Sequence, residues 1–191
     1  VTGLSRRDDG LDLTDEGRIA AALAPLAPGY DLVVVATGAL TIAGQGPEKS
    51  LRALDAGALA GQFALNAAGP ALVLKHVLRL MPRDRRSVFA ALSARVGSIG
   101  DNGLGGWYGY RAAKAALNQL IHTAAIEVAR THPHAVLALL HPGTVDTPLG
   151  PSYRAGHDAL PPAVAARHLL AVIDGLTPAQ SGGFFDWKGA V

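Results

Sequence analysis

Short apolar runs alternate along the chain with longer stretches in which apolar residues recur at helical spacing. The runs predict five strands, at residues 1–5, 31–36, 87–92, 136–141 and 183–185. The longer stretches predict helices at residues 15–26, 56–81, 108–130 and 161–174. Four of the five strands are apolar on both faces, as a parallel sheet covered by helices on each side requires. The alternation therefore predicts an α/β fold.

The length and composition fit a single globular domain, residues 1–191. Apolar residues make up 49% of the chain and charged residues 17%, which excludes a disordered protein. The net charge of +2 arises from interspersed residues of both signs, so no nucleic-acid partner is expected. No apolar run reaches about 18 residues, and the first residues lack the order of a secretory signal. Since cysteine is also absent, we expect a cytoplasmic protein with no membrane partner.

The stretch GGWYGYRAAKAALNQL, residues 105–120, places Tyr110 and Lys114 four positions apart at the start of a predicted helix. Residues at this spacing share a helix face. An ammonium beside a phenol favours the phenolate, and so lowers a phenol pKa whose ordinary value is about 10. Such a tyrosine could exchange protons near neutral pH. The same spacing also occurs on ordinary amphipathic helices, so the surrounding residues must decide between the two interpretations.

Two serines upstream of this pair are candidates for polarising a substrate oxygen. Ser98 lies twelve residues before Tyr110 in LSARVGSIGDNGLGG, just after an apolar strand. A hydroxyl there could donate a hydrogen bond to a carbonyl oxygen. Ser93 lies at the strand end itself, where bonding to turn backbone is the ordinary role. We favour Ser98 and keep Ser93 as the alternative.

With these residues the sequence resembles the short-chain dehydrogenase/reductase family, and GSIGDNGLGGWYGYRAAKAALN is most similar to the carbonyl reductases grouped with the C-factor and sniffer proteins. The resemblance implies a Rossmann-type, doubly wound, three-layer α/β/α fold. It also implies an enzyme that transfers hydride between a nicotinamide and a small carbonyl or alcohol substrate. Tyr110 would give or take the proton, Lys114 would hold the nicotinamide ribose and lower the phenol pKa, and Ser98 would orient the carbonyl.

Asn66 lies in QFALNAAGPALVLKH, where the family keeps an asparagine in the middle of its fourth helix as a further member of the catalytic group. Pro70 has no N–H, so the carbonyl of residue 66 loses its helical partner. A free carbonyl can hold a water, which in the family continues a proton relay from the lysine. The alternative is a tolerated kink with a polar residue facing solvent.

Two segments resemble the nicotinamide-binding parts of the family. The segment HPGTVDTPL follows a predicted strand and resembles P-G-x-V-x-T, although a Pro-Gly turn can also simply end a strand. This likeness assigns cofactor contacts to Pro142, Gly143, Val145 and Thr147. The segment VVVATGAL stands where the family has N-N-A-G, and the corresponding positions are Ala36, Thr37 and Gly38. Because the family's asparagines brace neighbouring strands, this departure concerns stability more than chemistry.

The stretch LSRRDDGLDLTD, residues 4–15, resembles the end of the second strand and the short third strand of the family. Arg6 and Arg7 favour NADP(H) over NAD(H), because a guanidinium can bind the 2′-phosphate in bidentate fashion. Two arginines beside two aspartates also make an ordinary solvated turn. The resemblance places Asp12 and Leu13 next to the adenine.

The glycine-rich phosphate loop of the family, T-G-x-x-x-G-x-G, does not occur in the sequence. The resemblance begins at the family's second strand, and the missing first strand is central in the family's strand order 3-2-1-4-5-6-7. A sheet without that strand would leave buried backbone groups unpaired. We therefore expect the sequence to be part of a longer protein; a naturally shortened chain would bind dinucleotide poorly.

The remaining motifs carry weaker hypotheses. The seven histidines form no H-E-x-x-H, so no metal site is expected, and the absence of G-x-S-x-G disfavours an α/β-hydrolase. His141 could contact the substrate or fill a strand end. Trp107 and Tyr108 could line a substrate pocket or serve only packing.

The long predicted helices also bear on assembly. Residues 56–81 and 108–130 contain small residues at close spacing, and in the family such helices pair across a dimer axis, so a homodimer or a higher homo-oligomer is expected. The long loops at residues 40–50 and 143–160 are expected over the site. A competing hypothesis is a non-catalytic dinucleotide-sensing or scaffold protein, which the missing phosphate loop supports.

Overall fold

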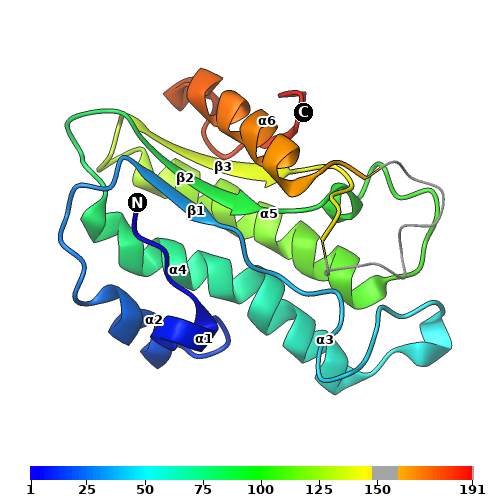
Figure 1. The fold of residues 1–191 in the computed structure, drawn as a ribbon. Helices are drawn as coiled ribbons and strands as arrows, with labels where there is room; N and C mark the ends of the chain where they lie inside the picture. Colours follow the sequence, from blue (N-terminus) through cyan, green and yellow to red (C-terminus); the bar gives the residue numbers. More distant parts are fainter. Residues whose placement is uncertain (148–158, 191) are drawn as a thin grey trace.

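The computed structural model describes residues 1–147 and 159–190, and a parallel sheet runs through its centre (Figure 1). The strands pair in the order β1-β2-β3-β4. Their bounds are β1 Leu32–Val35, β2 Ser87–Leu92, β3 Ala135–His141 and β4 Phe184–Asp186. All three pairings are parallel, so each pair is joined by a crossover. The predicted α/β fold is confirmed, and these strands lie within one residue of their predicted bounds.

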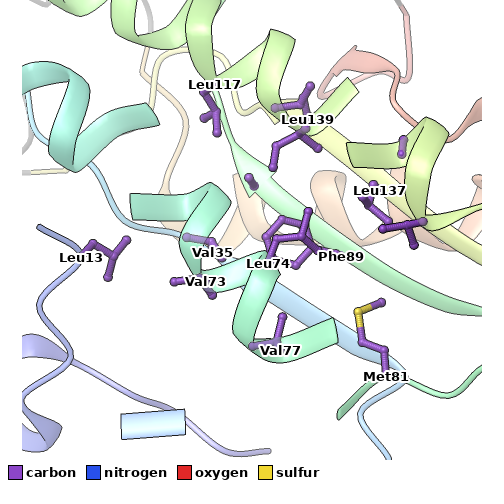
Figure 2. Close-up of a cluster of buried hydrophobic side chains, with 14 of the residues drawn as sticks. Leu13, Val35, Val73, Leu74, Val77, Met81, Phe89, Leu117, Leu137 and Leu139 are labelled. Carbon is purple, nitrogen blue, oxygen red and sulfur yellow. The ribbon is translucent and has the colours of Figure 1, made fainter. Parts of the chain in front are cut away.

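Helices cover both faces of the sheet and give three layers (Figure 1). One face packs against α2 (Glu16–Leu23), α4 (Gly69–Val77) and α5 (Tyr108–Val128), and the other against α6 (Pro162–Gly175). Residues of β2 alternate between the two cores, with Phe89 and Ala91 in the first and Val88 and Ala90 in the second. This alternation follows from the two-residue period of a strand. Figure 2 shows the first core, where Val35, Phe89 and Leu139 meet Val73, Leu74, Val77 and Leu117.

The predicted helix at residues 56–81 is one helical run with a widened turn in its middle. It comprises α3 (Ala56–Phe63), a π-helical turn (Ala64–Ala68), α4 and a 3₁₀ turn (Leu78–Leu80). The π turn ends just before Pro70, and Gly69 N–H donates to the Ala64 carbonyl. Because Pro70 cannot donate to the carbonyl of residue 66, the widened turn absorbs the irregularity. By length and composition alone, Ala56–Leu80 could cross a membrane, but its α4 residues lie in the core.

The remaining helical elements are short. They are α1 (Arg6–Asp9) and 3₁₀ turns at Leu51–Ala53, Arg95–Gly97 and Pro178–Gln180. Ser5 caps α1 by accepting from Asp8 N–H at 3.0 Å, and Gly10 ends it with a positive φ of 69°. This helix was not predicted; the same residues were expected to lead into a short third strand.

The predicted strand at residues 1–5 is wrong, because these residues form no ladder with the sheet. An apolar groove of about 380 Å³ separates residues 2–4 from β1. Leu32 and Val34 of β1 remain 39% and 45% exposed beside it. A strand exists only where a neighbour supplies backbone partners, and the described residues place none in this groove. The groove lies where the sequence analysis expected the missing strand.

Candidate active site

The carboxyl ends of three neighbouring parallel strands meet at one edge of the sheet. Ala36, Thr37 and Gly38 follow β1, Ser93 follows β2, and Pro142 follows β3. In open α/β sheets this edge is where ligands bind. The candidate site lies there, against the first turns of α5.

Tyr110 and Lys114 lie one turn apart on the buried face of α5. Tyr110 is 7% exposed and Lys114 is 2% exposed. The Lys114 amine lies 5.8 Å from the centre of the Tyr110 ring, and it donates a hydrogen bond of 2.7 Å to the Leu92 carbonyl at the end of β2. The predicted pairing of these two side chains is thus present in the structure.

Burial opposes the predicted effect of the lysine on the tyrosine. It raises the pKa of Tyr110 to about 12. Burial also lowers the pKa of Lys114 to about 8, because the charged amine loses water. In the chain by itself, the phenol pKa therefore lies above its ordinary value and not below it as expected. Removal of water from the phenol outweighs the attraction of an amine that is itself poorly solvated.

Close packing around the pair leaves no room for a methyl group at two glycines. A Cβ on Gly97 would lie 2.9 Å from both the carbonyl carbon and the Cβ of Lys114. A Cβ on Gly38 would lie 2.9 Å from Asn66 Oδ1 and 3.5 Å from Lys114 Nζ. The segment after β1 and the Arg95–Gly97 turn thus pack tightly against Lys114.

Asn66 is fully buried and binds the segment after β1. Its Oδ1 accepts from Ala39 N–H at 3.0 Å, and its Nδ2 donates to the Ala39 carbonyl at 2.9 Å. Nδ2 also donates to Gln62 Oε1 at 2.7 Å, and Gln62 Nε2 donates to the Leu40 carbonyl at 2.9 Å. The side chain thus faces protein rather than solvent, and it fixes the 38–40 segment beside Lys114.

The two candidate serines have different surroundings. Ser98 Oγ accepts from Asp101 N–H at 3.3 Å, and Ser98 lines a pocket of about 430 Å³ with Tyr108 and Ala112. Ser93 is buried and donates to Asn118 Oδ1 at 2.7 Å. Among the described hydrogen bonds, none joins either serine to Tyr110, so the choice between them stays open.

The segment after β3 follows the expected path as far as residue 147. Gly143 has a φ of 74°, and its N–H donates to His141 Nδ1 at 3.0 Å. Burial lowers the pKa of His141, so its ring is neutral at pH 7 and can accept this bond. Val145 forms a bridge with Leu160, and Thr147 N–H donates to the Val145 carbonyl at 2.9 Å. The rest of the predicted 143–160 loop, residues 148–158, lies outside the described residues.

The residues expected at the adenosine end lie apart from this cluster. Arg6 and Arg7 are exposed on α1. Asp12 Oδ1 accepts from the hydroxyl and the N–H of Thr14, bonds that lower the pKa of Asp12. Leu13 is buried against Gly69 and belongs to the core. The Arg7 guanidinium pairs with Asp8 Oδ1 at 3.3 Å on the surface, whereas the structural role of Leu13 is packing.

The aromatic residues before Tyr110 divide between two surroundings. The rings of Trp107 and Tyr110 meet edge to face, with centroids 6.4 Å apart. Tyr108 is 37% exposed and lines the pocket that contains Ser98. Trp107 therefore borders the candidate proton donor, and Tyr108 does not share that buried face.

Sequence reasoning missed three residues that support the site: Gly97, Gln62 and Glu48. Glu48 is 8% exposed, and its carboxylate accepts from Gly109 N–H at 3.0 Å. Gly97 and Glu48 act through contacts between segments distant in sequence, which no local pattern indicates, whereas Gln62 also bonds to Asn66 on its own helical run. The clearest local signal was the i, i+4 spacing of Gln62 and Asn66 on one helix.

The residues present fit the nicotinamide and ribose end of a dinucleotide. Three features lie at this edge of the sheet. They are the buried amine of Lys114, Gly38 with no room for a side chain, and the turn at Gly143. The described residues contain no glycine-rich phosphate loop. No group of three or more histidine or acidic side chains suited to a metal occurs in the part of the chain that the structure describes.

Comparison with known proteins places this geometry in a family. Residues 10–175 match the family model described as enoyl-(acyl carrier protein) reductase. The chain is 38% identical over 138 residues to the C-signal of Myxococcus xanthus. This match covers 71% of this chain and 78% of that protein. It is 32% identical over 178 residues to 1-hydroxy-2-glutathionyl-2-methyl-3-butene dehydrogenase of Rhodococcus sp. strain AD45, covering 93% of this chain and 75% of that enzyme.

Solved structures agree with the fold. An NADPH-bound carbonyl reductase from chicken fatty liver has a TM-score of 0.81 at 24% identity, over 94% of this chain and 74% of that chain. A short-chain dehydrogenase/reductase from Burkholderia multivorans with bound NADP has a TM-score of 0.77 at 28% identity, with the same coverage. The family model matches most of the chain, and two curated relatives are more than 30% identical to it. The chain therefore belongs to the short-chain dehydrogenase/reductase family of oxidoreductases.

Proposed function

We propose that the protein is an NADP(H)-dependent carbonyl reductase that interconverts a small carbonyl compound and its alcohol, with Tyr110 as the general acid–base. The observation that carries this proposal is the buried pair of Tyr110 and Lys114 at the carboxyl edge of the sheet. A proton donor and a cation held there by packing need no rearrangement before reaction. When bound, the cofactor would supply or accept the hydride.

The raised pKa of Tyr110 is compatible with the proton donation that carbonyl reduction requires. A phenol whose pKa is about 12 stays protonated at neutral pH, so it can give a proton to a carbonyl oxygen. The phenolate left behind would then be stabilised by the charged amine of Lys114. Alcohol oxidation would instead need that proton removed beforehand.

Different residues of the chain would bind different parts of the cofactor. Lys114 and Gly38 would hold the ribose, and Pro142, Gly143, Val145 and Thr147 would meet the nicotinamide end. Arg6 and Arg7 would meet the 2′-phosphate of NADP(H), since both guanidinium groups are exposed on α1. Neighbouring structures with bound NADPH or NADP support this choice of cofactor.

The assay is NADPH consumption by the purified full chain, measured at the nicotinamide absorbance against a panel of aldehydes and ketones. The proposal expects turnover with NADPH that exceeds turnover with NADH. Absence of turnover with every carbonyl, in a folded protein that binds NADPH, would contradict it.

A second candidate function is a non-catalytic dinucleotide sensor or scaffold. The observation that favours it is the curated relative named C-signal, a name that describes signalling. NADPH binding without turnover would favour the sensor, and neither binding nor turnover would favour the scaffold. A homodimer and a cytoplasmic location remain predictions from the sequence.

A further inference from the structure

Helix α5 begins without a cap of its own. Its N-cap residue, Trp107, has a left-handed backbone with φ of 53° and makes no side-chain capping bond. The first N–H groups of a helix have no partners within the helix and must find them elsewhere. This need is acute here because Tyr110 lies in that first turn.

Glu48, which precedes Gly109 by 61 positions, supplies the missing partners. Its backbone carbonyl accepts from Trp107 N–H at 2.5 Å, and its carboxylate Oε2 accepts from Gly109 N–H at 3.0 Å. An anionic oxygen at a helix N-terminus is also favoured by the helix dipole. One residue of the 40–50 loop thus provides both a main-chain and a side-chain bond to the start of α5.

The surrounding contacts hold Glu48 in this position. The residue is 8% exposed, and its loop is tied to α3 through Ile42, which packs on Gly61. A Cβ on Gly109 would lie 2.9 Å from Glu48 Oε1 and 3.2 Å from Gln62 Cγ. Glycine at position 109 is therefore what lets the carboxylate reach the backbone next to Tyr110.

We propose that Glu48 is a positioning residue, whose bonds to Trp107 and Gly109 hold the first turn of α5 so that Tyr110 stays aligned with Lys114. This inference rests on the proposed function of Tyr110 as the proton donor. Glu48 itself touches neither of the two side chains in the described contacts. It acts through the backbone of the residues just before Tyr110.

The test compares Glu48→Ala and Glu48→Gln with Asp55→Ala as a matched control. Asp55 caps α3 by accepting from Ala58 N–H at 2.8 Å, and it is exposed. Both alanine variants lose a capping acceptor, so both should lower the melting temperature. Only Glu48→Ala should lower kcat, by about tenfold or more, because misplaced reacting groups are costly. Its KM for NADPH should change little.

Glu48→Gln retains an acceptor oxygen and should recover most of the lost kcat. A Glu48→Ala enzyme whose kcat equals that of Asp55→Ala would overturn the inference. If Glu48→Ala does not fold, we would measure hydrogen exchange at the Gly109 amide in Glu48→Gln. Protection of this amide equal to that in the unmodified chain would support the cap. Fast exchange together with an unchanged kcat would overturn the inference. Failure of the proposed function looks different, since Tyr110→Phe would then leave turnover unchanged whatever happens at Glu48.

Discussion

The amine of Lys114 lies 5.8 Å from the centre of the Tyr110 ring, inside a site where both side chains are almost fully removed from water. The amine donates a hydrogen bond to the Leu92 carbonyl, and this bond links α5 to the end of β2. Burial raises the pKa of the phenol and lowers the pKa of the amine. Under the proposed function, the phenol would give a proton and the amine would stabilise the resulting anion.

The first prediction concerns the stability cost of Lys114. Its folded pKa of about 8 lies below its ordinary value, so between pH 8 and the unfolded pKa the unfolded chain binds more protons. Burial of the charged amine therefore lowers the free energy of unfolding, and this destabilisation is fully present below pH 8. Loss of the charge should raise the free energy of unfolding by about 1 kcal/mol between pH 7 and pH 9. Urea denaturation should show that this rise disappears in Lys114→Met.

Lys75→Met is the control for this experiment, because Lys75 is an exposed residue paired with Glu16 on the surface. It should keep the pH-dependent rise of the unmodified chain. An equal rise in Lys114→Met would mean that the amine is solvated in the folded protein.

The second prediction is the pH dependence of carbonyl reduction. Tyr110 stays protonated well above pH 9, whereas Lys114 loses its charge as pH rises through about 8. Because the charged amine stabilises the phenolate formed in the reaction, kcat for NADPH-dependent reduction should fall above pH 8. A kcat that climbs steadily from pH 7 to pH 9 would speak against this division of roles.

The third prediction tests the close approach of Gly97 to α5. In Gly97→Ala the new methyl would meet the Lys114 backbone at 2.9 Å, so the turn or the helix must move. We expect a loss of about 2 kcal/mol in unfolding free energy, together with a lower kcat. Gly100→Ala is the matched control, since a Cβ at Gly100 has no atom within 4 Å. Equal stability of the two variants would refute the packing argument.

The larger features of the fold could be predicted from the sequence because they depend on local patterns. Strands such as β2 are runs of apolar residues, and their positions follow from that alone. Residues 1–5 were also predicted as a strand but form none, because a ladder depends on a neighbouring strand that the local pattern does not reveal.

The site was partly predictable for the same reason. Tyr110 and Lys114 are related by helical spacing, and the structure brings them together. The pKa direction of Tyr110 was predicted wrongly, because spacing indicates the nearby amine but not how completely both groups are buried. The cap from Glu48 joins residues far apart in sequence, so no local motif could indicate it.

The fourth prediction concerns the choice of cofactor. In the double variant Arg6→Ala, Arg7→Ala, the KM for NADPH should rise about tenfold or more, because two charged donors to the 2′-phosphate are lost. The KM for NADH should stay nearly unchanged. Arg130→Ala, an exposed arginine beyond the end of α5, serves as the control. An equal rise in both KM values would reject the assignment of these arginines to the 2′-phosphate.

The most direct test of the account is steady-state turnover of Tyr110→Phe, measured beside its affinity for NADPH. Removing one hydroxyl leaves the buried ring in place, so the cofactor should still bind. We predict a loss of kcat of about a thousandfold with little change in the dissociation constant for NADPH. Turnover that persists at the rate of the unmodified chain would contradict the role of this phenol as the proton donor.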